Sequence, residues 1–363
     1  MKVALICFSL TGQQTGERLC RGLEAAGMTA ELDKKSKYLL DSIQISTSAW
    51  AGEKFSDSDA LIFIGATGIA VRSIAPYVAS KKSDPAVLVV DECGKFVISL
   101  LSGHLGGANE LALKTAEILE AIPVVTTATD LHHRFAVDVF AKKNGCAIFH
   151  MKAAKEASAA LLAGEKIGFY SEFPWEGDLP DGLVLCGKDG IPSTTGTGQR
   201  NASAGEVPET GIAVTLHRSC LPFTNTVHVV PPAAVLGMGC RKGKDAASIQ
   251  SAAIECLQEA DLYKEALHSI ASIDLKKDES GLAKFCKAHG WPITFYPADE
   301  LRAVPGQFTP SAFVASVTGV DNVCERSAVK ASGGMLLLPK TAGGGVTLAL
   351  AVRPFAPDWR TEQ

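Results

Sequence analysis

Phe96-Val97-Ile98-Ser99-Leu100-Leu101 is an apolar, strand-like run that enters the turn Ser102-Gly103-His104-Leu105-Gly106-Gly107. A helix-like segment follows from Ala108 to Leu119. Glycines in a strand-to-helix turn let a ligand approach the backbone, and the helix end offers free N–H groups to an anion. His104 places an imidazole, which can transfer protons, beside that anion site. The alternative is a tight turn whose histidine makes only a local contact.

Composition indicates a multi-domain globular protein. A chain of 363 residues is longer than one hydrophobic core usually organises, so two or three domains are expected. A composition of 47% apolar and 20% charged residues is typical of a folded chain. The formal net charge of −4 argues against nonspecific nucleic-acid binding but leaves a small anionic ligand open. No apolar run approaches the ~18 residues of a membrane span, and polar residues after Phe8 interrupt the first run too early for a signal peptide.

Cysteine usage indicates a reducing compartment. Ten cysteines are scattered between Cys7 and Cys324, several of them in apolar runs, and no two form a Cys-x-x-Cys pair. Buried thiols explain this pattern better than structural zinc does. We therefore expect a cytoplasmic protein without a metal site of its own.

The first 145 residues read as strands alternating with helices, which is typical of an open parallel sheet. The buried strand Ala60–Ile64 runs into a turn in which Gly68 would let a ligand approach the backbone closely. Arg72 in the same turn has a guanidinium that could bind a carboxylate through two hydrogen bonds. Another buried strand, Ala86–Val90, is followed by Glu92, and ligands of open α/β sheets bind at the carboxyl ends of strands. The alternative is a solvent-exposed turn that binds no ligand, which would show the same residues.

Two more carboxylates follow the glycine turn. Asp130 ends a β-branched stretch that begins at Ile122. Asp138 lies on a mostly apolar, helix-like segment and therefore needs a partner. It either caps local structure or orients another group, and we favour the structural role.

Residues 146–231 alternate short strands with turns and carry no evident chemistry, and Pro231-Pro232 marks a boundary. Beyond it, a strand ends in a glycine turn whose Gly-x-Gly-x-x-x-Gly spacing is one residue too long for the strict dinucleotide fingerprint. In that turn Gly239 would let a ligand approach the backbone closely, while the positive charges of Arg241 and Lys242 favour a polyanionic or carboxylate-rich ligand.

Near the C-terminus, Glu325 and Arg326 are neighbours in sequence, so on a helix they do not face each other. Either one of them contacts a ligand or both are surface charges. Residues 335–340 and 345–351 predict a closing hairpin. The whole pattern predicts a multi-domain α/β protein with domains over 1–145, 146–231 and 232–355. The outer two have open, mostly parallel sheets flanked by helices, and the middle α/β domain is smaller.

Four motifs resemble the CbiG family, the cobalt-precorrin-5A hydrolases of anaerobic cobalamin biosynthesis. In chain order they are residues 103–109, residues 125–130 with Asp138, residues 237–243 and residues 319–326. Together they span most of the chain and are more specific than any one alone. The C-terminal part also resembles the stand-alone CobE-type proteins of the aerobic route, so by itself it does not indicate a hydrolase.

The resemblance implies that water opens a δ-lactone on ring A of a cobalt tetrapyrrole and that acetaldehyde leaves, giving cobalt-precorrin-5B. Such a reaction needs a base and a site for an oxyanion. We expect His104 to be the general base or acid, with Asp130 or Glu92 orienting it or taking the proton of the alcohol. Backbone amides around Gly106 and Gly107 would hold the oxyanion. The macrocycle itself accepts electron density, so no cofactor beyond the substrate's cobalt is expected.

The expected substrate contacts are glycines, which let the macrocycle approach the backbone closely, and polar or charged side chains, which bind its carboxylates. They are Gly103, Gly106, Gly107, Asn109, Gly68, Arg72, Gly239, Arg241, Lys242, Glu325 and Arg326. The macrocycle is expected between the N- and C-terminal domains, because ligand sites favour domain junctions. Neighbouring pathway enzymes are expected partners, whereas nucleic acid and membranes are not.

Two other functions fit parts of the pattern. A non-catalytic carrier of tetrapyrrole intermediates would need the same carboxylate contacts. A nucleotide-dependent oxidoreductase is supported only by the glycine turns.

Overall fold

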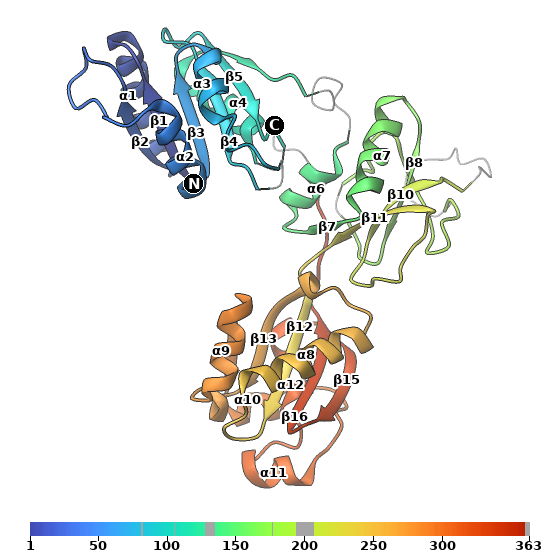
Figure 1. Cartoon of the computed structure of the whole chain (residues 1–363). Helices are drawn as coiled ribbons and strands as arrows, with labels where there is room; N and C mark the ends of the chain where they lie inside the picture. The colour runs from blue at the N-terminus through green and yellow to red at the C-terminus, as the bar shows by residue number, and fades with distance from the viewer. Residues whose placement is uncertain (81–82, 105, 128–134, 176, 194–206, 360–363) are drawn as a thin grey trace. The chain divides into compact units, whose positions relative to one another are not determined.

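The computed structural model describes residues 1–80, 83–104, 106–127, 135–175, 177–193 and 207–359. Asp130 and Leu105 lie outside them. The chain forms two compact units, residues 1–139 and 140–363 (Figure 1). Among the described residues, no helix combines the length and apolarity needed to cross a bilayer. The predicted α/β class, with open and mostly parallel sheets flanked by helices, is confirmed.

The first unit contains a six-stranded sheet in the order β2-β1-β3-β4-β5-β6. The strands are β1 (Lys2–Cys7), β2 (Thr29–Lys34), β3 (Ala60–Ile64), β4 (Ala86–Val90), β5 (Phe96–Leu101) and β6 (Ile122–Val124). The first four are parallel to one another. Strand β5 runs antiparallel to β4 and parallel to β6. The last two strands therefore point the opposite way from the first four.

Helices cover both faces of this sheet because alternate residues of its buried strands point to opposite sides. Leu5 packs with helices α1 (Leu10–Ala25) and α4 (Ala108–Leu119). Ile6 packs on the other face with α2 (Thr47–Asp57) and α3 (Thr67–Ile74).

A tight turn after β4 causes the reversal of β5. Asp91 accepts hydrogen bonds from the backbone amides of Cys93 (3.1 Å), Lys95 (2.7 Å) and Phe96 (2.6 Å). The carboxylate therefore organises a hairpin and is not offered to a ligand. As a result Leu101, at the end of β5, lies opposite Val87 near the start of β4.

Helix α6 (Val137–Lys143) crosses the boundary between the units, so Asp138 belongs to the first unit, and the second unit holds two sheets. The first has the order β7-β11-β10-β8-β9 and is parallel except for β7. Its elements are β7 (Ala147–Phe149), α7 (Met151–Leu162), β8 (Ile167–Ser171), β9 (Leu183–Leu185), β10 (Thr210–Val214) and β11 (Asn225–Val230).

The other sheet has the order β14-β13-β12-β16-β15, with β12, β13 and β14 parallel. Its strands are β12 (Ala234–Cys240), β13 (Leu267–Ile273), β14 (Ile293–Tyr296), β15 (Met335–Gly343) and β16 (Val346–Val352), and the last two form the predicted hairpin. Helices α8 (Ala246–Glu259) and α9 (Ser280–His289) pack on one face.

The opposite face carries α12 (Cys324–Ser332). Gly237 on β12 allows its close approach, because a Cβ there would lie 1.8 Å from the carbonyl oxygen of Cys324. Two short helices, α10 (Ala298–Arg302) and α11 (Ala312–Thr318), precede α12 (Figure 1).

Candidate functional site

The turn that carries His104 is tight and internally hydrogen-bonded. Ser102 has a φ of 60° and Gly107 a φ of 84°, both in the left-handed region that strains most side chains. A Cβ at Gly106 would lie 2.3 Å from the Cβ of Ser102, so this position requires glycine. The chain thus reverses within six residues and delivers His104 at the start of α4.

Three backbone amides, at the end of this turn and the start of α4, are hydrogen-bonded to carbonyl groups of the turn. Gly107 donates to the carbonyl oxygen of His104 at 3.0 Å, and the next two amides donate to those of Ser102 (3.1 Å) and Gly103 (3.0 Å). A bonded N–H cannot also stabilise a developing oxyanion without losing its partner. The expectation that backbone amides around Gly106 and Gly107 hold the oxyanion is therefore not supported at Gly107, whose N–H already has a partner.

Among the described residues, Asp138 places a carboxylate beside His104. His104 Nδ1 lies 3.3 Å from Asp138 Oδ2, and the two side chains are only 15% and 18% exposed. Asp138 lies in the first turn of α6, and its Oδ1 accepts a hydrogen bond from the amide of Val139 at 3.0 Å. With Nδ1–H donating to the carboxylate, Nε2 carries the lone pair that can accept a proton. This geometry fits the orienting role for Asp138, the alternative that we did not favour.

Asn109 ties the turn to strand β5 and to the segment that follows β6. Its side-chain oxygen accepts from Ser99 Oγ at 2.6 Å and its amide nitrogen donates to Thr127 Oγ1 at 2.9 Å. A Cβ at Gly103 would lie 2.8 Å from this amide, which explains the glycine there. Asn109 is buried, so it supports His104 by fixing the turn, and the expected direct contact with substrate is not favoured.

Glu92 lies at the other end of the sheet from His104. It follows the carboxyl end of β4, whereas His104 follows β5, which runs back beside β4. A five-residue strand spans about 15 Å at ~3.3 Å per residue, which is too far for a hydrogen bond. Glu92 instead accepts from Ser9 Oγ at 2.7 Å, and its carbonyl oxygen accepts from Thr15 Oγ1 at 2.7 Å. The expected pairing of Glu92 with His104 is therefore wrong, and Glu92 anchors the start of α1.

Gly68 and Arg72 share the end of the sheet where Glu92 lies. Both belong to α3, which follows the carboxyl end of β3, a strand parallel to β4. The Arg72 guanidinium lies over Gly68, with a nitrogen 3.3 Å from where a Cβ would be. The two residues are thus near each other, as expected, but they do not join the His104 site.

The glycine turn after β12 presents cations at the carboxyl end of the C-terminal sheet. The amide of Arg241 donates to the carbonyl oxygen of Gly345 at 2.9 Å, and both Arg241 and Lys242 are exposed. A Cβ at Gly239 would lie 2.7 Å from Thr347 Oγ1, so this glycine lets β16 approach.

A carboxylate closes the same turn. Glu279 accepts from the amide of Gly243 at 2.8 Å and from Lys276 Nζ at 3.1 Å. The bond from the Gly243 amide, followed by Lys276 and Lys242, lowers the pKa of Glu279 and keeps it ionised. Lys276 is thereby paired, whereas the head groups of Arg241 and Lys242 form no hydrogen bond or ion pair with the residues that the structure describes.

Glu325 is neither a surface charge nor exposed to a ligand. It is 1% exposed, and its carboxylate accepts from the amide of Thr309 (2.7 Å), from Thr309 Oγ1 (2.8 Å) and from the amide of Lys340 (2.7 Å). A buried carboxylate requires such donors because desolvation is costly. The expected substrate contact is therefore wrong. Glu325 ties the loop before α11 to strand β15.

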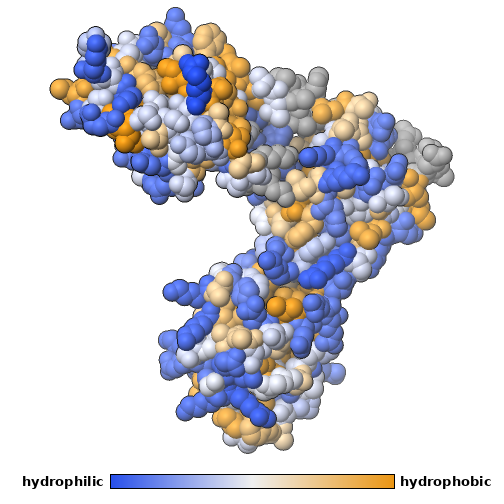
Figure 2. Space-filling view, viewed as in Figure 1, coloured by the Kyte–Doolittle hydropathy of each residue, from blue (hydrophilic) through white to orange (hydrophobic). Residues whose placement is uncertain are grey.

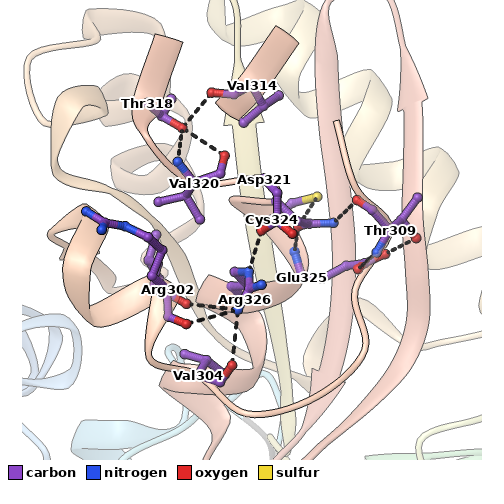
Figure 3. Close-up of polar contacts among 12 residues, drawn as sticks. Arg302, Val304, Thr309, Val314, Thr318, Val320, Asp321, Cys324, Glu325 and Arg326 are labelled. Atoms are coloured by element: carbon purple, nitrogen blue, oxygen red, sulfur yellow. Dashed lines mark hydrogen bonds and ion pairs between the residues drawn. The ribbon is translucent and has the colours of Figure 1, made fainter. Parts of the chain in front are cut away.

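Arg326 is used in the same way, as Figure 3 shows. Its Nε donates to Asp321 Oδ1 at 2.8 Å, and one terminal nitrogen donates to the carbonyl oxygens of Leu301 (3.3 Å), Arg302 (3.4 Å) and Val304 (3.1 Å). Its guanidinium also lies 4.5 Å from the centre of the Phe308 ring. With these donors engaged internally, the expected pairing of Arg326 with substrate carboxylates is not supported.

Comparison with known proteins identifies the family. Three family models match in order: Cobalamin synthesis G N-terminal over residues 49–130, Cobalamin biosynthesis central region over 135–231 and Cobalamin synthesis G C-terminus over 234–351.

Individual relatives agree with the family models. A cobalt-precorrin-5A hydrolase from Salmonella typhimurium strain LT2 is 35% identical, over 96% of this chain and 97% of its own. One from Priestia megaterium is 34% identical, over 83% and 80% respectively. Protein CobE from Sinorhizobium sp. is 29% identical over 32% of this chain and 78% of its own. By these full-length similarities, the chain belongs to the CbiG family, the cobalt-precorrin-5A hydrolases of cobalamin biosynthesis.

Proposed function

We propose that this chain hydrolyses cobalt-precorrin-5A, opening the ring A δ-lactone and releasing acetaldehyde to give cobalt-precorrin-5B. Two relatives with this name match it over most of their length. The observation that supports the mechanism is the largely buried pair of His104 and Asp138 in the first unit. An imidazole held by a carboxylate through one nitrogen is a typical general base at its other nitrogen.

The chemistry assigned to His104 is one proton transfer in each direction. Nε2 takes a proton from water, whose oxygen attacks the lactone carbonyl carbon. The carbonyl–alkoxide bond then breaks, and the imidazolium returns its proton to the alkoxide, which leaves a carboxylic acid and a secondary alcohol. Asp138 stabilises the imidazolium formed between these steps and keeps the ring in one orientation.

The second bond broken is carbon–carbon. Loss of the alcohol's O–H proton to a base converts the two-carbon fragment into acetaldehyde, and the electron pair of the broken bond passes to the macrocycle. His104, neutral again after the first step, is the base that we assign. No cofactor beyond the cobalt of the substrate is required. Catalysis by the purified chain after exhaustive dialysis against a chelator would test this point.

Substrate carboxylates are assigned to the exposed cations of the second unit. Arg241 and Lys242 follow β12. Each charge-assisted hydrogen bond to an exposed carboxylate adds modest affinity. We expect Arg241→Ala to raise KM by about threefold to tenfold while kcat changes little. An unchanged KM would remove this role.

The test of the function is direct. Purified protein is mixed with cobalt-precorrin-5A, and acetaldehyde is measured with a coupled alcohol dehydrogenase. Release of one acetaldehyde per substrate supports the proposal, whereas stoichiometric binding without release would make the chain a carrier. We also place the protein in the cytoplasm, where its ten cysteines, all free thiols in the structure, would remain reduced.

A further inference from the structure

Helix α11 presents an apolar pair to solvent at the carboxyl end of the C-terminal sheet. Phe313 is 76% exposed and Val317 is 62% exposed, and a spacing of four residues places them on the same helix face. Val314 points the other way and packs against Ile273, the last residue of β13. Leu275, just beyond β13, is also 60% exposed. Figure 2 shows apolar residues next to hydrophilic ones where Figure 1 draws α11.

A dedicated network holds α11 in this position. Its N-cap Ser311 donates its amide to the carbonyl oxygen of Asp321 at 2.8 Å. The preceding loop is fastened at Thr309, which donates to Glu325 and accepts from Asn322 Nδ2 at 2.8 Å (Figure 3). A seven-residue helix is not stable by itself, so these bonds maintain it. The residues from 319 to 326 therefore position α11, which offers its apolar side outward.

Unpaired cations follow a neighbouring strand at the same end of this sheet. Strands β12 and β13 are parallel, so Arg241 and Lys242 after β12 lie at the same sheet edge as Leu275 after β13. Within the described part of the chain, the head groups of Arg241 and Lys242 form no hydrogen bond or ion pair. This edge thus combines large exposed apolar side chains with exposed positive charge.

We propose that the outward face of α11, with Phe313 and Val317, covers the flat face of the macrocycle while Arg241 and Lys242 hold its peripheral carboxylates. This inference rests on the proposed function, which supplies a ligand that is both apolar and polyanionic. Charge complementarity favours a polyanionic ligand at Arg241 and Lys242, whereas a symmetric second copy would bring the same two cations to this face. The face of α11 then determines affinity and not the chemical step.

The test uses the full-length chain with Phe313→Ser and Val317→Ser combined. Both side chains are exposed, so folding should be retained. The control is Leu221→Ser, which removes an equally exposed apolar side chain from another part of the second unit, 60% exposed. Binding of dicyanocobyrinic acid, a stable cobalt corrinoid with free carboxylates, is measured by calorimetry, and KM and kcat for cobalt-precorrin-5A are measured by acetaldehyde release.

We expect the double variant to bind the corrinoid about tenfold or more weakly and to raise KM similarly, with kcat within about twofold, because two large apolar contacts are lost. A Kd and KM equal to those of the control would overturn the proposal. So would a dimeric wild type that becomes monomeric in the double variant, since a second copy would then occupy the face. If the wild type releases no acetaldehyde, the proposed function fails, and the corrinoid Kd alone decides this inference.

Discussion

Replacing Glu325 with Gln separates a structural carboxylate from a substrate-binding one. The substitution keeps the shape of the side chain but changes one oxygen into an N–H donor. One carboxylate oxygen accepts from the amide of Thr309, and the other accepts from the amide of Lys340 and from Thr309 Oγ1. Whichever way the new amide is turned, its NH2 group faces a backbone N–H.

The expected cost follows from that geometry. One buried backbone donor loses its acceptor, which costs about 1–3 kcal/mol, and the remaining hydrogen bonds lose their ionic character. We therefore expect the second unit to be destabilised by about 2–4 kcal/mol. Burial at 1% exposure leaves no route for water to rescue the orphaned donor.

The assay is urea denaturation combined with hydrogen–deuterium exchange. Peptides containing Thr309 or Lys340 should exchange faster in Glu325→Gln, and the unfolding midpoint should fall. Lys330→Gln is the matched control, because it alters an exposed ion pair on the same helix and should be nearly neutral. An unchanged midpoint and unchanged exchange, together with weakened substrate binding, would refute the structural role and restore the substrate contact.

Three further predictions follow. Gly237→Ala should destabilise the second unit by about 3 kcal/mol or more in urea, because its Cβ would lie 1.8 Å from a carbonyl oxygen of α12, whereas Gly343→Ala, with nothing within 4 Å, should be tolerated; equal midpoints would contradict this. The hydrogen bond to Glu172 raises the pKa of His217 from 6.5; for Glu172, burial opposes the shift, but bonds from His217 and its neighbours lower its pKa from 4.5. The ion pair therefore contributes its full stabilisation, about 1 kcal/mol, between pH 4.5 and pH 6.5. The loss of unfolding free energy in His217→Gln should shrink as pH rises through the raised pKa of His217, or as pH falls through the lowered pKa of Glu172. A difference in unfolding free energy that does not change with pH would contradict the pairing. Asp138→Asn should lower kcat about 10²–10⁴-fold with KM little changed, and a kcat within twofold of wild type would show that the carboxylate does not orient the base.

Local patterns predicted most of the strands, since buried apolar runs ending in glycine turns have few alternatives. Strands β3, β4 and β5 and the C-terminal hairpin appear where the sequence places them, whereas β2 (Thr29–Lys34) was not predicted. What the pattern could not provide was strand direction. The hairpin after β4 depends on Asp91 accepting three backbone amides, and this reversal separates Glu92 from His104.

The roles of charged residues were harder to predict, because burial is a tertiary property. Glu325 and Arg326 follow a glycine turn just as ligand contacts do, yet most of their partners lie 15 to 25 residues away along the chain. Asp138 was recognisable as a carboxylate in an apolar segment that needed a partner. Its partner is 34 residues away, which only the fold could identify.

The central claim is that His104 supplies the base for lactone opening, and single-turnover acetaldehyde release by His104→Ala tests it most directly. The control is His268→Ala, a histidine of the second unit that contacts Arg353. We predict that His104→Ala folds normally, binds dicyanocobyrinic acid like the wild type and releases acetaldehyde about 10²–10⁴-fold more slowly. A His104→Ala protein that releases acetaldehyde at the wild-type rate would contradict the assignment.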